Sequence, residues 1–258
     1  MTIKQVLVTG ATGKTGSIVF QKLDRDPDFQ VKGLARSPEK AKDLFGSTEN
    51  ENFHFGDITD KESIEAAFAD CQKLVILTSA SPQMTAPPKQ GERPQFEYPA
   101  DGTPELVDYR GQKNQIDLAI AAGIEHIVLV GSMGGTNENH PLNKMGNGKI
   151  LIWKRKAEEY LANSGINYTI IRAGGLLDKP GGVRKLIVGD NDELLVNPPN
   201  GIPTSIPRAD VAETVVRALK EPSAIDKAFD LISYPEADTN SVTKDFADLF
   251  AQATKAKF

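Results

Sequence analysis

The chain has 258 residues, of which 39% are hydrophobic and 25% are charged, and its formal net charge at pH 7 is −5. This composition predicts a globular protein with a full core, and the negative charge gives no basis for nucleic-acid binding, which requires a basic surface. Cys71 is the single cysteine, so no internal disulfide can form. No apolar run approaches the roughly 18 residues of a membrane span.

The N-terminus leads directly into an apolar strand, without the pattern of a signal or transit peptide. We therefore expect a cytoplasmic protein, or a protein of the plastid stroma if a transit peptide has been removed. The histidines and the cysteine lack the spacing of metal ligands, so no metal site is expected. The expected partner is a small-molecule substrate, and a homodimer is compatible with the sequence.

The first predicted strand, at residues 5–8, ends in a glycine-rich turn with the sequence TGATGKTG at 9–16. Gly10 permits a tight turn, Gly13 lets the backbone approach a pyrophosphate, and Gly16 lets the following helix pack closely on the strand. The free N–H groups at the helix start would then face the phosphates. The turn predicts a dinucleotide site with the cofactor-binding residues Gly10, Thr12, Gly13, Lys14, Thr15 and Gly16.

Short apolar segments alternate with amphipathic segments along the next part of the chain. Further strands are predicted at 31–35, 53–56, 74–78, 127–130 and 168–172, and helices at 37–45, 60–68, 116–121 and 151–163. Asp60 is the predicted N-cap of the second of these helices. Such alternation is typical of an α/β fold with a doubly wound parallel sheet, the Rossmann fold.

The last third of the sequence is less regular, with four prolines within 194–207. The elements predicted there are a helix at 209–219, a strand at 229–233 and a terminal helix at 243–253. We interpret 1–258 as a single dinucleotide-binding domain whose C-terminal part, from about residue 174, contributes the substrate side. Long loops at 79–104 and 131–148 emerge at the carboxyl ends of the strands, where open α/β sheets bind ligands.

The end of the second predicted strand favours NADP over NAD. An NAD site usually has an Asp or Glu there, which accepts hydrogen bonds from the ribose hydroxyls, whereas this chain has Arg36. A guanidinium forms a forked contact with a 2′-phosphate, which an acid would repel, and Lys14 supplies a second cation nearby. The alternative is that Arg36 is a solvated residue at a helix start.

The ends of the third and fourth strands supply the remaining candidates for cofactor binding. Asp57 either accepts a hydrogen bond from the adenine amino group or caps the next helix. Ile58 would pack beside the adenine ring. Thr78 and Ser79 would line the ribose and nicotinamide part of the cofactor.

Eight segments together make the sequence resemble the short-chain dehydrogenase/reductase superfamily. They are TGATGKTG (9–16), GDITD (56–60), VILTSA (75–80), GQKNQIDLA (111–119), VLVGSMGGTN (128–137), WKRKAEEYL (153–161), YTIIRAGGLLD (168–178) and IPRADVAE (206–213). The resemblance is to the atypical, NmrA-like branch, and within it to a plant and cyanobacterial group of NADP-binding proteins of unassigned substrate. It spans nearly the whole chain.

This resemblance implies two catalytic residues, Ser132 after the fifth strand and Lys154 on the next helix. Lys154 would also hold the nicotinamide ribose, and backbone groups of Gly174 would meet the carboxamide. The family's catalytic tyrosine lies four residues before the lysine, where this chain has Ile150. A carbonyl reduction would therefore take its proton from elsewhere. The candidates are Tyr98, Tyr109 and His140, or an ordered water.

Three functions remain open at this point. The first is an NADP-dependent oxidoreductase acting on a small carbonyl or quinone-like substrate, which the retained Ser132 and Lys154 favour. The second is a non-catalytic NADP-binding redox sensor or scaffold, which the missing tyrosine favours. The third, an isomerase or dehydratase, is weakened most by the missing tyrosine.

Overall fold

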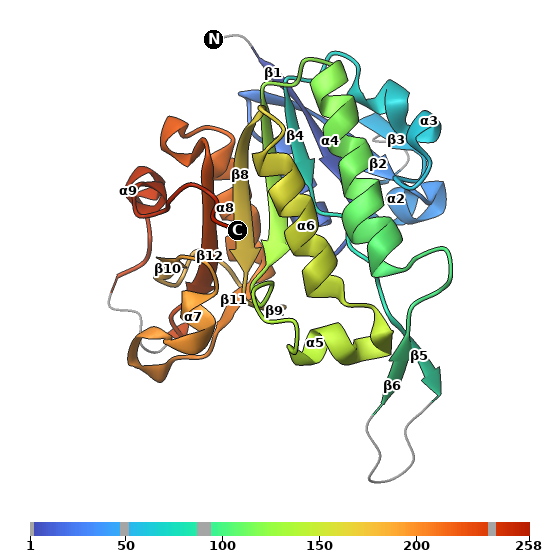
Figure 1. The fold of residues 1–258 in the computed structure, drawn as a ribbon. Coiled ribbons are helices and arrows are strands. Elements are labelled where there is room, and N and C mark those ends of the chain that lie inside the picture. Colours follow the sequence, from blue (N-terminus) through green and yellow to red (C-terminus); the bar gives the residue numbers. More distant parts are fainter. Residues whose placement is uncertain (1–2, 47–51, 87–93, 237–240) are drawn as a thin grey trace.

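A computed structural model describes residues 3–46, 52–86, 94–236 and 241–258 of the chain. Within these ranges eight strands form one sheet, in which β10 alone runs antiparallel to its neighbour (Figure 1). Their order is β10 (Leu186–Gly189), β12 (Lys227–Ser233), β8 (Asn167–Ala173), β7 (His126–Ser132), β4 (Lys73–Ile76), β1 (Lys4–Thr9), β2 (Phe29–Ala35) and β3 (Phe53–Phe55). The predicted doubly wound α/β fold is confirmed.

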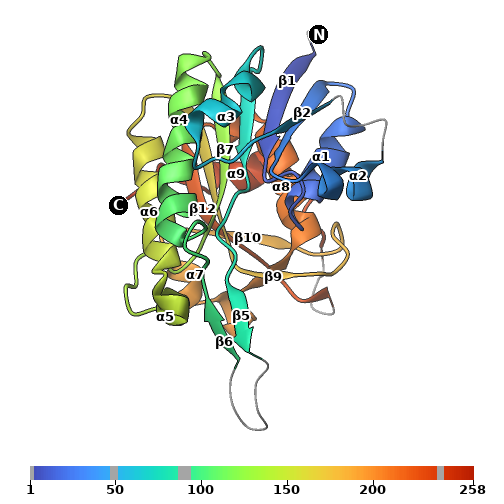
Figure 2. The same ribbon diagram turned by 90° about the vertical axis from the view of Figure 1, so that its right-hand side faces the viewer.

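Helices cover both faces of the sheet (Figures 1 and 2). In β1, Val6 and Val8 belong to one apolar cluster and Leu7 belongs to the other, because successive side chains of a strand point to opposite faces. The first cluster includes side chains of α1 (Gly16–Asp24), α2 (Pro38–Phe45), α8 (Arg208–Ala218) and α9 (Phe246–Ala251). The second cluster, on the other face, includes side chains of α3 (Lys61–Ile64), η2 (Glu65–Phe68), α4 (Gln112–Ala121) and α6 (Ile150–Ala162). No helix in the described ranges has the length and apolar character needed to cross a bilayer.

The carboxyl ends of the strands carry the longer connections. After β4 the chain forms an antiparallel hairpin that projects from the body of the protein (Figure 2). The elements in these connections are the hairpin strands β5 (Gln83–Ala86) and β6 (Gln95–Glu97), the π-helix η3 (Glu105–Gly111), α5 (Pro141–Lys144), η4 (Met145–Asn147), β9 (Gly175–Leu177), α7 (Glu193–Val196), η5 (Pro199–Gly201) and β11 (Ser205–Pro207). A last short helix, η6 (Pro222–Ala224), precedes β12 at the opposite edge.

The structure differs from the sequence prediction in the segments between the main elements. The predicted loop at 79–104 contains the strands β5 and β6, and residues 87–93 of that loop lie outside the described ranges. These strands are short and mostly polar, so they carry no apolar period that the sequence could reveal. The terminal helix begins at Phe246 rather than near 243, because the Asp245 carboxylate accepts the N–H of Asp248 (2.9 Å) and caps the first turn.

His126 is a buried histidine held in its neutral form. Its side chain is 2% exposed, and its Nε2 lies 2.9 Å from the Thr169 hydroxyl. That hydroxyl donates to the carbonyl oxygen of Ala224 (2.7 Å), so it accepts from Nε2–H. Protonation would place a charge on the buried Nδ1, and this burial, with a smaller effect of the nearby Lys73 ammonium, lowers the pKa of His126 to about 3.

We expect His126 to make the protein lose stability in acid. Between pH 6.5 and pH 3 the unfolded chain binds a proton at this position and the folded chain does not, so the free energy of unfolding falls as the pH falls. The contribution is about 1.4 kcal/mol per pH unit for one group. Urea unfolding at pH 7, 6 and 5 should therefore show a shallower pH dependence for His126→Gln than for the unaltered protein. Equal slopes would contradict the expectation.

Candidate functional site

In the glycine-rich turn between β1 and α1, two of the three glycines leave no room for a side chain, and the third has a single close contact. Gly10 has φ +69°, and a Cβ there would lie 2.9 Å from the carbonyl carbon of Leu77. A Cβ at Gly16 would lie 2.1 Å from the carbonyl oxygen of Gly10, whereas at Gly13 the contact is 3.1 Å and no other described atom is within 4 Å. No described side chain caps α1 at its N-cap residue, Thr15. The turn therefore presents open backbone and helix N–H groups to a pyrophosphate, so it fits a dinucleotide.

This geometry predicts different outcomes for two valine substitutions. Gly13→Val should fold and lose NADPH binding, because its side chain would extend into the space above the turn. Gly16→Val should unfold the protein or strongly destabilise it, because its Cβ overlaps the backbone of Gly10. Thermal unfolding and the enhancement of NADPH fluorescence distinguish the two variants. Normal NADPH binding by folded Gly13→Val would exclude this turn as the pyrophosphate site.

The predicted 2′-phosphate site lies at the ends of β2 and β3. Arg36 is 75% exposed, and its guanidinium lies 3.9 Å from the Asp57 carboxylate. Asp57 also accepts hydrogen bonds from the N–H (2.9 Å) and hydroxyl (2.7 Å) of Thr59, while Asp60 accepts the N–H of Ser63 and caps α3. The predicted cap is thus Asp60, and Asp57 organises the turn before it. The Arg36 side chain stays accessible to an anion.

Polar side chains of α4 hold the two loops that follow β3 and β4. Asn114 donates to the carbonyl oxygen of Ile58 (2.9 Å), and the Ile58 side chain is buried against α4 and η3. Gln112 donates to the carbonyl oxygen of Thr78 (3.1 Å), and Gln115 donates to its hydroxyl (3.2 Å). The predicted residues Ile58 and Thr78 are thereby fixed by one helix. Ile58 lies mostly within the core, so little of its surface remains for an adenine ring.

Lys14 does not join Arg36 in the structure. Its ammonium lies 3.2 Å from the carboxylate of Asp178, which follows β9, and Asp178 also pairs with Arg208 at the start of α8 (2.5 Å). The hydrogen bond from Lys14 and the charge of Arg208 lower the pKa of Asp178. Lys14 therefore connects the glycine turn to the segment that follows β9, rather than supplying a second cation beside Arg36.

Ser132 and Gly174 lie at the carboxyl ends of neighbouring strands. Ser132 pairs in register with Ala173, the last residue of β8, and its hydroxyl donates to the carbonyl oxygen of Met133 (3.1 Å). The N–H of Gly174 donates to the carbonyl oxygen of Leu231 in β12 (3.0 Å), so this N–H is engaged in the fold. The serine hydroxyl is only partly buried, which leaves it able to reorient toward a ligand.

Lys154 forms a buried ion pair with Asp108, a residue that the sequence prediction missed. The ammonium lies 2.7 Å from one carboxylate oxygen, and the two side chains are 11% and 0% exposed. The second carboxylate oxygen accepts the N–H of Ala80 (3.0 Å), next to the exposed Ser79. Asp108 therefore joins α6 to the loop after β4. The polar series at 108, 112 and 115, along one side of an otherwise amphipathic helix, is the signal that could have revealed it.

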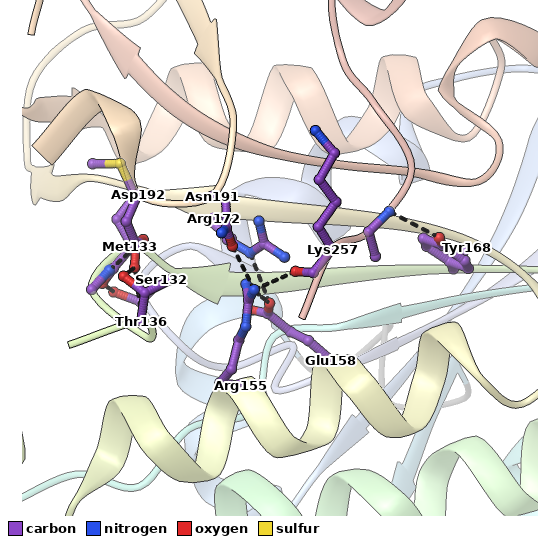
Figure 3. A network of polar contacts seen from close by, with 12 residues as sticks. Ser132, Met133, Thr136, Arg155, Glu158, Tyr168, Arg172, Asn191, Asp192 and Lys257 are labelled. Atoms are coloured by element: carbon purple, nitrogen blue, oxygen red, sulfur yellow. Dashed lines mark hydrogen bonds and ion pairs between the residues drawn. The ribbon is translucent and has the colours of Figure 1, made fainter. Parts of the chain in front are cut away.

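A buried network of charges supports the loop that follows Ser132 (Figure 3). Glu158 accepts a hydrogen bond from Arg172 (2.8 Å), and both side chains are 2% exposed. Asp192 accepts hydrogen bonds from the N–H of Gly134 (2.7 Å) and from the N–H and hydroxyl of Thr136. On α6, Glu158 faces β8 and Lys154 faces η3, so the two side chains bind different partners.

The same network extends to the C-terminal residues. Arg155 donates to the side chain of Asn191 (2.5 Å) and to the carbonyl oxygen of Lys257 (Figure 3). Burial and the nearby Asp192 carboxylate raise the pKa of Asp230, on β12, to about 6. The segment around residue 191 is therefore anchored to α6 by Arg155.

Comparisons with known proteins agree with this geometry. A family model described as NAD(P)H-binding matches residues 10–222. An uncharacterized chloroplastic protein of Arabidopsis thaliana is 56% identical over 252 residues, which cover 96% of this chain and 75% of that protein. Sanguinarine reductase of Eschscholzia californica is 49% identical over 269 residues, which cover 96% of each.

A comparison of folds gives the same result. The structure of a putative NAD-dependent epimerase/dehydratase from Bacillus halodurans superposes with a TM-score of 0.70 at 23% identity. The match covers 96% of this chain and 99% of that one. At this identity the likeness concerns the fold alone.

Proposed function

Because the chain belongs to the NAD(P)H-binding family, we propose that it is an NADPH-dependent oxidoreductase acting on a small carbonyl or quinone-like substrate. The observation that carries the proposal is the retained polar pair at the carboxyl edge of the sheet. Ser132 ends β7 with an accessible hydroxyl, and Lys154 is held on α6 by Asp108.

Different residues at this edge of the sheet suit different parts of the reduction. Bound NADPH supplies the hydride. The Lys154 ammonium keeps N–H donors beyond its bond to Asp108, and these suit the ribose hydroxyls of the nicotinamide half. The Ser132 hydroxyl suits the oxygen of a carbonyl, where negative charge develops during reduction. Apolar substrates are favoured, because large apolar side chains are exposed on elements at this edge: Met84 (52%), Leu142 (39%), Leu176 (39%) and Val196 (75%).

We expect Arg36 to select NADPH over NADH. Arg36→Ala should weaken NADPH binding by about 1.5–3 kcal/mol, the scale of a charge-assisted contact, and leave NADH binding nearly unchanged. Lys40→Ala, which removes an exposed cation from neighbouring α2, is the matched control and should change neither. Calorimetric titration of both cofactors measures the difference. Equal loss for the two cofactors in Arg36→Ala would exclude the 2′-phosphate role.

The activity itself is tested by NADPH oxidation. The purified protein should consume NADPH, followed by its absorbance, in the presence of at least one acceptor from a panel of quinones, small diketones and N-alkyl iminium ions. Tight NADPH binding without turnover of any acceptor would contradict the oxidoreductase proposal. That result would favour a redox sensor or scaffold, the function to which Ile150 in the tyrosine position points.

The comparisons also support a location. A relative at 56% identity is named as chloroplastic, and we propose that this protein works in the plastid stroma or an equivalent compartment. The reducing conditions there suit a chain whose Cys71 is buried and unpaired.

A further inference from the structure

A proton donor is the part of the proposed reduction that the family pattern does not supply. The residue one helical turn before Lys154 is Ile150, which has no proton to give. The sequence leaves three side chains open, namely Tyr98, Tyr109 and His140. The structure separates them, because each comes from a different connection and has a different environment.

Two of these side chains are engaged elsewhere. The Tyr109 ring stacks on Trp153, with ring centroids 5.7 Å apart and an interplanar angle of 28°. The His140 Nδ1 accepts the N–H of Leu142 (3.3 Å) at the N-cap of α5, and its ring lies over Gly134. These contacts account for the positions of both rings.

The Tyr98 ring packs against two glycines that precede α6, Gly146 in η4 and Gly148 after it. A Cβ at Gly148 would lie 2.3 Å from Cε2 of the Tyr98 ring and 2.8 Å from Pro104, and a Cβ at Gly146 would lie 3.2 Å from Cδ2 of the same ring. Gly148 is two residues before Ile150. The connection after β6 thus places the Tyr98 ring against the segment that leads into α6.

Packing explains the ring of Tyr98 but not its hydroxyl. The side chain is half buried, and within the described ranges its hydroxyl forms no hydrogen bond. A phenylalanine ring would pack equally well there, and no hydroxyl would have to be partly desolvated. Burial and the charge of Asp108 raise the pKa of Tyr98, so the phenol keeps its proton at neutral pH. Asp108 in turn contacts the Lys154 ammonium.

We propose that Tyr98, whose ring packs against Gly146 and Gly148 before α6, donates the proton for carbonyl reduction. This inference rests on the proposed function. The hydride of NADPH, with its electron pair, bonds to the carbonyl carbon, and the π electrons of the carbonyl bond move to oxygen. The oxygen takes the phenol proton, giving an alcohol, NADP⁺ and a phenolate. Water then returns a proton to the phenolate.

The test compares Tyr98→Phe with Tyr109→Phe and His140→Gln. With a small diketone at saturating NADPH, Tyr98→Phe should lower kcat about 100-fold, the scale of general acid catalysis, and leave the Kd of NADPH unchanged. The other variants should stay within about threefold of the unaltered protein. An N-alkyl iminium ion needs hydride but no proton, so Tyr98→Phe should reduce any such acceptor at the unaltered rate.

Each other outcome overturns the assignment. Unchanged diketone reduction by Tyr98→Phe excludes Tyr98 as the donor, and a large loss in His140→Gln alone moves the role to that histidine. If Tyr98→Phe lowers kcat equally with diketone and iminium acceptors, Tyr98 has a structural role and is not the proton donor. Reduction of iminium ions alone by the unaltered protein means that no donor is needed. An unaltered protein that binds NADPH and reduces nothing overturns the proposed function itself.

Discussion

The carboxylate of Asp108 is the constraint on which the candidate site depends. It is fully buried and bonds at once to the Lys154 ammonium on α6 and to the N–H of Ala80 after β4. A buried charge is tolerated only when it is paired, and removing one partner of such a pair costs about 3–5 kcal/mol. Separating α6 from the loop after β4 would therefore leave an unpaired charge. This energy holds α6 and the loop after β4 together on the two sides of the proposed nicotinamide site.

A second layer of buried charge supports the substrate side. Arg172 and Glu158 lie in the core beneath the carboxyl end of β7, and Asp192 binds the backbone that follows Ser132. Buried ion pairs contribute little net stability when compared with apolar replacements, but they define geometry, because a displaced partner loses its counter-charge. The network thus holds the loop after Ser132, which lacks regular secondary structure, in one conformation.

The glycine turn, the segment after β9 and the start of α8 are also joined at the surface. Lys14 in the glycine turn pairs with Asp178, and Asp178 pairs with Arg208. These side chains are largely exposed, except that of Arg208, so salt screens their attraction and the contacts are weak. Such a contact opens at little cost.

The sequence by itself determined the α/β fold, the glycine turn and the strand-end positions of Arg36 and Ser132. Each depends on a local pattern: apolar runs between amphipathic segments, glycines at fixed spacing, or a residue directly after a strand. The tertiary structure alone decided that Lys154 pairs with Asp108, that Lys14 faces Asp178, and that the Tyr98 ring packs against Gly148 before α6. These contacts join residues from separate connections, whose approach is set by how the helices and the hairpin pack around the sheet, and no local period records that packing.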